Sequence, residues 1–532
     1  MEKHVGISEQ ETCFYDKVTG RTVYTADIQK DNILEITLVR STFAHARLLN
    51  ISFPKLPADC YVFTAKDLVK NQIPFMMNDM PVLASDHIRF HGEPVAIVAS
   101  PSKEKADEIA SLVEVEYEKY ETVDSIQDAL EEKAKLYDSG NICTTFHSER
   151  GNAQEVSDSC DLVTEGVFET PVQIHGFIEP ECAFTYINED GKLVIACGKD
   201  GNTACVFPAV VTSLTKRPAR LVFTREEDVR YFVKHRSSIV KAKLGFSKDG
   251  IIRAAKIEML LDTGAYVLCE PSVFKSGLEH FAECYNIENV TLDGKLICTN
   301  HVPASAICGF WNVQAVFAVE NLISRAASEL GLDQIEIRQK NVVPTSGAGQ
   351  ALKMFEKSAF HKEMKEKPQN YCGYGLALGI TDNFTDAAFT VQGAKVKVDP
   401  LTGKIDVLWI HNTAKIGSVK NSQLYDGFVF GGVSMGLGMT LTEQVRYKDG
   451  ISLENSFANY NMPTALDVPL LTNEFVSTEE NTEPSGKNET AELSAVAVAP
   501  AITSAVESLY ENLTMNKLPV DRMSILKARR IK

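Results

Sequence analysis

The sequence predicts a mixed α/β protein of several domains, and its length and its alternation of strand and helix patterns lead to this prediction. The chain has 532 residues, more than one hydrophobic core usually supports, so we expect three or four domains. Alternating apolar residues that indicate strands recur along the chain between stretches with helical periodicity. Such a mixture is typical of sheets covered by helices.

The first region, from about residue 17 to residue 122, contains a strand, a helix and a second strand. A turn at 91–93 leads into a continuous apolar run at 94–99, which predicts a buried strand. A helix is expected from about 103 to 112. Apolar side chains then alternate with glutamates from 113 to 118, which predicts a half-buried strand with an acidic outer face. A helix crossing between two strands indicates an α/β layer.

The segment from about 124 to 151 is charged and has no sustained apolar period, so we expect a linker and a domain boundary there. Beyond this segment the pattern again indicates a mixed α/β domain. Its predicted strands are 192–196, 220–224 and 254–261.

One long helix is predicted in this second domain, over residues 312–330. Its apolar residues form one face, and Gly331 is a suitable stop. The next segment, 343–369, is polar and rich in lysine, which indicates a connection and a second boundary. The last region contains a hairpin, with strands at 396–398 and 405–407 around a turn that holds Asp, Pro and Gly.

Composition excludes several classes of function. The net charge of −17 would repel a nucleic-acid backbone, so nucleic acid is not an expected partner. No apolar run approaches the roughly 20 residues that cross a bilayer, and the amino terminus has no secretory pattern, so we expect no membrane insertion and a cytoplasmic location. The 12 cysteines are scattered without zinc or iron–sulfur spacing, so we expect them to be reduced and mostly buried and to form no metal site.

The segment Gly486–Glu492 is the most informative candidate for chemistry. Small residues precede the lone carboxylate of Glu492, and an apolar run follows from Leu493 to Val506. Such an arrangement would suit a general base held against a buried reaction centre. An exposed glutamate that leads a helix and is stabilised by the helix dipole is the alternative interpretation.

Segments spread over most of the chain resemble one known family. They are residues 17–21, 40–41, 45–46, 92–96, 178–181, 225–228, 235–236, 262–266, 338–341, 398–403 and 463–469. Together they resemble the molybdenum-binding large subunit of the xanthine dehydrogenase and aldehyde oxidase family. The resemblance implies an N-terminal α/β hammerhead domain (1–128) and two mixed α/β molybdopterin-binding domains (150–345 and 370–532), the last shortened.

The resemblance implies a molybdenum hydroxylase, and Glu492 stands where the family carries its catalytic glutamate. The expected reaction is the oxidative hydroxylation of a purine, another nitrogen heterocycle or an aldehyde with oxygen from water. The expected cofactor is a molybdopterin-type molybdenum cofactor. Iron–sulfur and FAD centres are expected on separate partner subunits, because this chain has motifs for neither.

Two further segments resemble family sites and differ from them. Gly309, Phe310 and Gln314 match a segment in which a phenylalanine stacks on the substrate, so Phe310 is a candidate substrate platform or an ordinary core residue. Gly309 and Gln314 are candidate cofactor contacts. The family's arginine before this glycine is Cys308 here, and a thiol cannot replace a guanidinium fork.

The family's glycine-rich cradle is reduced in this chain. Gly198 remains as a candidate cofactor contact and Asp200 as a candidate substrate contact, although a surface turn would explain both. The chain also lacks the block that the family inserts near 385–393, and Phe428 replaces an expected glutamine. These differences favour an alternative function, in which a homologue without cofactor acts as a scaffold or assembly subunit. The glycines between 431 and 438 would serve helix packing or a phosphate loop.

Overall fold

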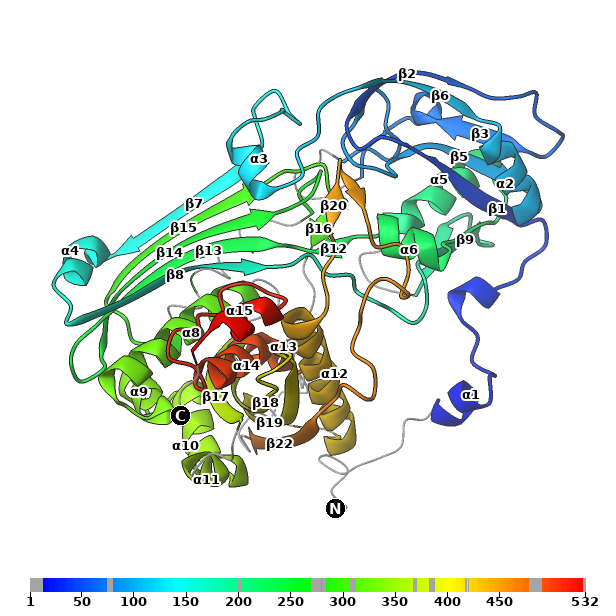
Figure 1. Ribbon diagram of the computed structural model, residues 1–532. Coiled ribbons are helices and arrows are strands. Elements are labelled where there is room, and N and C mark those ends of the chain that lie inside the picture. The colour runs from blue at the N-terminus through cyan, green and yellow to red at the C-terminus, as the bar shows by residue number, and fades with distance from the viewer. Residues whose placement is uncertain are drawn as a thin grey trace.

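The computed structural model describes residues 13–73, 80–198, 203–268, 279, 284–305, 312–366, 371–381, 388–416, 419, 421–477 and 490–529. Within these residues the chain forms a mixed α/β protein (Figure 1). The predicted fold class is therefore confirmed.

A six-stranded sheet and a three-stranded sheet form the part of the molecule that contains the N-terminal region. The six-stranded sheet has the order β10 (Leu193–Cys197), β9 (Cys182–Ile187), β11 (Ala219–Val222), β1 (Leu34–Arg40), β5 (Pro94–Ser100), β3 (Tyr61–Thr64). The three-stranded sheet has the order β4 (His87–Ile88), β2 (Ala46–Ser52), β6 (Glu114–Lys119). Helices α2 (Lys103–Ser111), α5 (Val206–Thr215) and α6 (Arg225–Tyr231) accompany these strands.

The strand, helix and second strand that were predicted in the first region are all present, as β5, α2 and β6. The two strands, however, lie in different sheets. Every residue of β5 is buried, and in β6 the glutamates face outward while Val115 and Tyr117 are half-buried. The β6 strand instead pairs with β2, for example through Ile51 and Val115. The alternation of side chains shows which face of a strand is buried, but it does not reveal the neighbouring strand.

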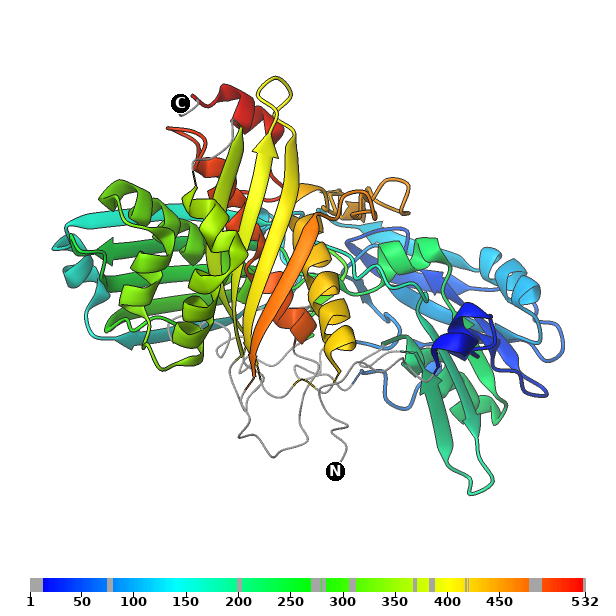
Figure 2. The ribbon, with the colours of Figure 1, turned by 90° about the horizontal axis from the view of Figure 1, so that it is seen from below.

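A five-stranded sheet and a four-stranded sheet enclose the largest core. The five-stranded sheet has the order β7 (Ile142–Arg150), β15 (Asn289–Ile297), β14 (Ile252–Asp262), β13 (Ser238–Phe246), β8 (Leu162–Thr170). The four-stranded sheet has the order β17 (Cys372–Thr381), β18 (Ala388–Val398), β19 (Ile405–Ile416), β22 (Leu470–Ser477). Figure 2 shows this second sheet side on, with α12 beside β22.

Helix α8 (Asn312–Leu330) lies between these two sheets, because it packs against β8 and β13 on one side and β17 on the other. The remaining helices of this part of the molecule are α3 (Ile126–Leu130), α4 (Ala153–Asp158), α9 (Gln334–Asn341), α10 (Gly347–Lys357), α11 (Ala359–Lys365), α12 (Ser422–Leu441), α13 (Thr490–Val496), α14 (Val498–Glu507) and α15 (Arg522–Lys527). The pairs β12 (Lys234–His235) with β16 (Ala304–Ser305) and β20 (Tyr447–Lys448) with β21 (Ile451–Ser452) complete the described strands. The predicted helix at 312–330 and the hairpin that joins β18 to β19 are both confirmed.

A fully buried ion pair joins α8, α9 and β17. The Nε atom of Arg338 lies 2.8 Å from Oε2 of Glu320, and the backbone N–H of Leu378 donates to the same oxygen at 2.8 Å. Arg338 also donates to the carbonyl oxygen of Leu376. Because a buried ion pair is tolerated only when its remaining polar atoms are hydrogen-bonded, this network fixes how α8 sits on β17.

The predicted linker at 124–151 was wrong in part. It contains α3, whose N-cap Ser125 accepts a hydrogen bond from the backbone of Asp128, and the edge strand β7. No residue of β7 is fully buried, so this edge strand has no continuous apolar face that would give a period in the sequence. The predicted connection at 343–369 likewise contains α10 and α11. The buried residues Ala348, Ala351, Leu352 and Phe355 of α10 have helical spacing that the lysines obscured.

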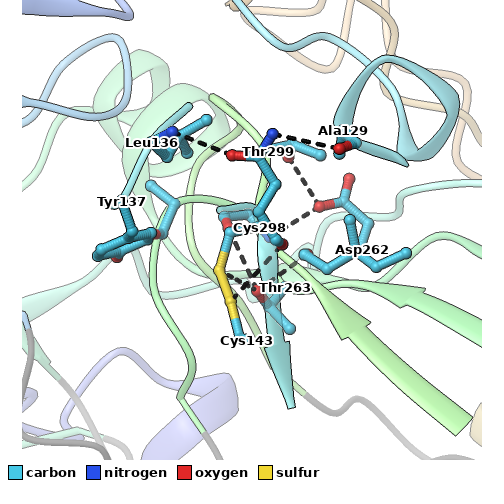
Figure 3. The surroundings of a disulfide bond; sticks show 12 residues. Ala129, Leu136, Tyr137, Cys143, Asp262, Thr263, Cys298 and Thr299 are labelled. Atoms are coloured by element: carbon cyan, nitrogen blue, oxygen red, sulfur yellow. Dashed lines mark hydrogen bonds between the residues drawn. A yellow bond between two sulfur atoms is a disulfide. The ribbon is translucent and has the colours of Figure 1, made fainter. Parts of the chain in front are cut away.

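The prediction that the cysteines are reduced was wrong for one pair. A disulfide joins Cys143, near the start of β7, to Cys298, just after β15 (Figure 3). The two strands are antiparallel neighbours, and Ile142 pairs with Ile297 in their register. The two cysteines are 155 residues apart in the sequence. The spacing of cysteines along the chain therefore could not predict that they are bonded. Cys60, Cys160, Cys182, Cys205 and Cys372 form no disulfide.

Candidate functional site

The candidate site is at one end of the four-stranded sheet. Thr381, the last residue of β17, pairs with Ala388, the first residue of β18. The parallel strands β19 and β22 end together, with Ile416 opposite Ser477. Helix α12 follows β19 and helix α13 follows β22 in the chain, so both helices start from this end of the sheet.

Helices α13 and α14 run antiparallel to β17. A Cβ atom added at Gly373 would overlap the carbonyl oxygen of Ala505, and one added at Gly379 would lie 3.2 Å from a methyl group of Val496. Later residues of β17 therefore contact earlier residues of the two helices. By this alignment the first turn of α13, with Glu492, lies near the carboxyl end of β17.

Helix α8 starts at the same end. The Thr503 hydroxyl donates to Asn321 at 2.9 Å, and Arg325 lies 2.8 Å from Glu507. The second contact lies four residues after the first on both helices, so α8 and α14 run in the same direction. The N-termini of α8, α12 and α13 thus lie toward one end of the sheet. The helix dipoles make such an end favourable for negative charge, and at the start of α12 the side chain of Asn421 accepts from the backbone N–H groups of Gln423 and Leu424.

Glu492 is in the first turn of α13 and is partly buried. The next residue, Leu493, is 1% exposed and packs with Ala388 and Ala414 at the end of the sheet. The predicted carboxylate ahead of a packed segment is present, and its catalytic role remains a prediction.

Gln314 is in the first turn of α8 and is 1% exposed. Its side-chain nitrogen lies 3.3 Å from Nε2 of His235, which therefore acts as the acceptor. Its side-chain oxygen and that of the neighbouring Asn312 are buried and have no hydrogen-bond partner in the described part of the chain. Two buried acceptors at the start of one helix are unusual, because such atoms are normally satisfied.

The other predicted site residues are not brought to this end of the sheet by any described contact. Gly198 is exposed in a turn after β10 in the six-stranded sheet, where an added Cβ would lie 2.4 Å from the carboxylate of Glu179. Asp200, Gly309 and Phe310 lie outside the described residues.

A row of hydrogen-bonded polar residues in the four-stranded sheet was not predicted from the sequence. Thr390, Gln392 and Asn412 are buried in this row, and Asn473 and Asp426, which continue it, are half-buried. The available signal was the presence of amide side chains at inward positions of otherwise apolar strands. Buried polar groups need partners, so a strand that carries them inward indicates a network.

Lys415 is a second residue that the sequence analysis did not select. Its amine is buried and has no hydrogen-bond partner among the residues described. Burial lowers the pKa of this amine. Because neighbouring side chains of a strand point to opposite faces, Lys415 lies across the sheet from Ala414 and α13, beside Gly347 at the start of α10.

Three family models match the chain. Residues 19–121 match the α/β hammerhead domain of aldehyde oxidase and xanthine dehydrogenase, and residues 198–342 and 313–469 each match a molybdopterin cofactor-binding domain. The chain belongs to the molybdenum hydroxylase family. Within this family it corresponds to the molybdopterin-binding large subunit, with the hammerhead domain first and the cofactor-binding domains after it.

Similar proteins include members with different described substrates. The chain is 28% identical over 447 residues to a probable xanthine dehydrogenase subunit of Bacillus subtilis, covering 74% of this chain and 59% of that protein. It is 28% identical over 366 residues to the nicotinate dehydrogenase large molybdopterin subunit of Eubacterium barkeri, covering 61% of this chain and 86% of that protein. The chain thus spans less than two thirds of the Bacillus protein.

Solved structures share the fold. Aldehyde oxidoreductase from Desulfovibrio gigas superposes with a TM-score of 0.89 at 19% identity, covering 99% of this chain and 81% of that one. Quinoline 2-oxidoreductase from Pseudomonas putida 86 superposes with a TM-score of 0.87 at 18% identity, covering 99% and 98%. At these identities the agreement establishes the architecture.

The described residues at the end of the four-stranded sheet fit a molybdopterin cofactor. A pterin carries N–H donors at its edge, and the unpartnered oxygens of Asn312 and Gln314 are acceptors that could receive them. The helix termini at this end favour the phosphate of the same cofactor. Within the described ranges, no three or more His, Cys, Asp or Glu side chains are grouped so that they could hold a metal ion.

None of the helices that could be described combines the length and the apolar composition required to cross a bilayer.

Proposed function

We propose that this chain binds a molybdenum cofactor at the end of its four-stranded sheet and is the catalytic subunit of a hydroxylase. The substrate class would be a purine, another nitrogen heterocycle or an aldehyde. The observation that supports this proposal most directly is the pair of buried oxygens on Asn312 and Gln314 that have no partner among the described residues, on the helix whose start lies toward the same end as Glu492. The partners would be an iron–sulfur subunit and an FAD-binding subunit, in the cytoplasm.

Glu492 would act as the general base. When bound, the cofactor supplies the capacity for a two-electron oxidation. Hydroxylation with oxygen from water requires that water loses a proton, and a carboxylate oxygen of Glu492 would accept it. The packing of Leu493 against Ala388 and Ala414 would hold this carboxylate in place. Asn312 and Gln314 would orient the cofactor by accepting hydrogen bonds.

Metal analysis tests cofactor binding. The full chain, purified together with its natural partner subunits, is expected to contain molybdenum and pterin in a 1:1 ratio with this chain. The double variant Asn312→Leu with Gln314→Leu should lose most of the bound pterin, because both acceptors are removed. Wild-type protein that is consistently free of molybdenum and pterin would refute the proposal.

Substitution of Glu492 tests its role separately. In protein loaded with molybdenum, Glu492→Gln should lower kcat by about 10²–10⁴-fold, the usual contribution of a general base, without changing the molybdenum content. Glu511→Gln, at an exposed glutamate, is the control and should leave kcat unchanged. Equal kcat values for wild type and Glu492→Gln would exclude Glu492 as the base.

A scaffold subunit without cofactor is the second candidate function. One observation favours it, since Phe428, where the family has a cofactor-binding glutamine, is 41% exposed on α12 and presents an apolar ring. The same metal analysis separates the two candidates. Empty protein that still assembles with its partner subunits would support the scaffold.

A further inference from the structure

A row of hydrogen-bonded amide side chains crosses β18, β19 and β22 of the four-stranded sheet, on the face where Gln392 contacts α13. Gln392 on β18 donates to Oδ1 of Asn412 on β19 at 3.1 Å, and Nδ2 of Asn412 donates to Asn473 on β22 at 2.8 Å. Asn473 donates in turn to Oδ1 of Asp426 on α12 at 3.0 Å. We call these four residues the amide ladder. Gln392 and Asn412 are at most 1% exposed.

The ladder has a defined direction. An ionised carboxylate can only accept hydrogen bonds, so Asn473 must turn its N–H₂ group toward Asp426 and its oxygen toward Asn412. The oxygen of Asn412 then faces Gln392, where it also accepts from the hydroxyl of Thr390 at 2.6 Å. The acceptor oxygen of Asp426 is therefore linked, through Asn473 and Asn412, to the orientation of the Gln392 amide at the other end of the ladder.

The far end of the ladder contacts α13. Nε2 of Gln392 also donates to the carbonyl oxygen of Ser494 at 2.7 Å. Ser494 is in the last turn of the short helix α13. If the Gln392 amide were flipped, its oxygen would face two other acceptors, the oxygens of Asn412 and Ser494, so only one orientation is favourable.

We propose that the amide ladder, with Gln392 as its contact to α13, is a positioning device for Glu492. Ser494 follows Glu492 by two residues on the same helix, so a hydrogen bond that holds Ser494 also limits movement of the first turn. The ladder ties this turn to β18, β19, β22 and α12 at once. The link to catalysis rests on the role proposed above for Glu492, whereas the link to the order of α13 does not.

Hydrogen exchange measures the order of α13 without any activity. Gln392→Met has nearly the same size but removes the donor, and Asn473→Leu interrupts the ladder at β22. Both variants of the full chain should reduce the protection of the amides in residues 490–497 by about tenfold, the effect of losing a buried hydrogen bond. Protection in α8 should stay unchanged.

Thr472→Val is the matched control. Thr472 is next to Asn473 on β22, but its side chain lies on the other face, where it accepts a hydrogen bond from Trp409 at 2.7 Å and forms a hydrogen bond with Nδ1 of His411 at 2.8 Å. This variant also removes hydrogen bonds between β19 and β22, so it reports a general loosening of the sheet. If it lowers the protection of α13 as much as Asn473→Leu does, the ladder has no specific role and the proposal fails.

Two variants of Asp426 test the direction of the ladder. Asp426→Leu removes the final acceptor and should lower the protection of α13, although Asp426 does not contact that helix in the ladder. Asp426→Asn keeps an oxygen that can accept from Asn473, so it should restore most of the protection. Unchanged protection in Asp426→Leu would overturn the proposed transmission along the ladder.

Kinetics of molybdenum-loaded protein separate positioning from the proposed function. Gln392→Met should lower kcat and displace the acid limb of its pH profile, because the base is held less precisely, and should leave KM within about twofold. If wild type shows no hydroxylase activity but the exchange results hold, the proposed function fails and the ordering of α13 stands. If the exchange results hold and both kcat and its pH profile equal those of wild type, the positioning of Glu492 is refuted.

Discussion

At the scale of single residues, burial determines which side chains can change protonation near neutral pH. Glu443 is 4% exposed, and its carboxylate accepts hydrogen bonds from Tyr460 at 2.5 Å and from Gln173 at 3.2 Å. Burial raises the pKa of Glu443 to about 7, although these two hydrogen bonds oppose the shift. Two good partners therefore do not fully replace the water that this carboxylate loses.

The raised pKa of Glu443 predicts a pH-dependent stability. The folded state binds the proton more tightly than the unfolded chain, whose carboxyl titrates near 4.5. The stabilising contribution is therefore fully present below about pH 4.5 and is lost as the pH rises to about 7. A shift of this size corresponds to roughly 3 kcal/mol. Urea unfolding at pH 5 and pH 8 should show that Glu443→Gln gains stability relative to wild type by about this amount at pH 8. A difference independent of pH would contradict the assignment.

At the scale of elements, glycines allow α14 to approach β17 closely. A Cβ atom at Gly375 would overlap the carbonyl oxygen of Ala501 and the backbone nitrogen of Ala505. Gly436 of α12 similarly faces Val498 of α14, where an added Cβ would lie 2.6 Å from its Cβ. The packing interpretation of the glycines in α12 is thus supported at Gly436, whereas Gly431 faces open space.

Two glycine substitutions test this close approach. Gly375→Ala should lower the free energy of unfolding by roughly 1–3 kcal/mol, because rigid backbone atoms must move to admit the methyl group. Gly427→Ala should raise it by up to about 1 kcal/mol, since Gly427 is in α12 with no atom near its added Cβ and alanine favours a helix. Chemical denaturation of both variants measures the two effects. A neutral Gly375→Ala would contradict the close packing of α14 on β17.

At the scale of the whole molecule, buried contacts join the N-terminal region to the five-stranded sheet. The side chain of Asn300 accepts from the backbone of Val123 at 2.8 Å and donates to the carbonyl oxygens of Ala44 and Arg89. The Cys143–Cys298 disulfide lies only two residues away along the chain, and Thr263 contacts its Cys298 sulfur (Figure 3). This disulfide closes a loop of 155 residues, which restricts the unfolded chain.

Loss of the disulfide should destabilise the oxidised protein. Peptide mapping without reductant is expected to recover Cys143 linked to Cys298. Cys143→Ser should lower the free energy of unfolding by about 2–4 kcal/mol, which would be measured as a lower thermal midpoint. Reduction of the wild-type protein should also lower the thermal midpoint. Cys160→Ser, at a free cysteine, is the control. A wild-type midpoint that does not respond to complete reduction would argue against a stabilising role.

Part of the fold could be predicted from local pattern alone. The helix at 312–330 was predicted with its observed bounds, because its apolar residues repeat at helical spacing over several turns. The hairpin between β18 and β19 was predicted from its turn residues. Elements whose stability comes from tertiary contacts, such as α3 and β7, carry too weak a pattern to be recognised.

The same division applies to the site. By itself the sequence determined the mixed α/β class, the family resemblance and the carboxylate of Glu492 ahead of an apolar helix, because each depends on residues close together in the chain. Only the tertiary structure decided that the starts of α8, α12 and α13 lie toward one end of a sheet and that Gln392, Asn412, Asn473 and Asp426 form one ladder. The physical reason is that partners far apart in sequence are selected by sheet register and helix packing, which no local pattern specifies.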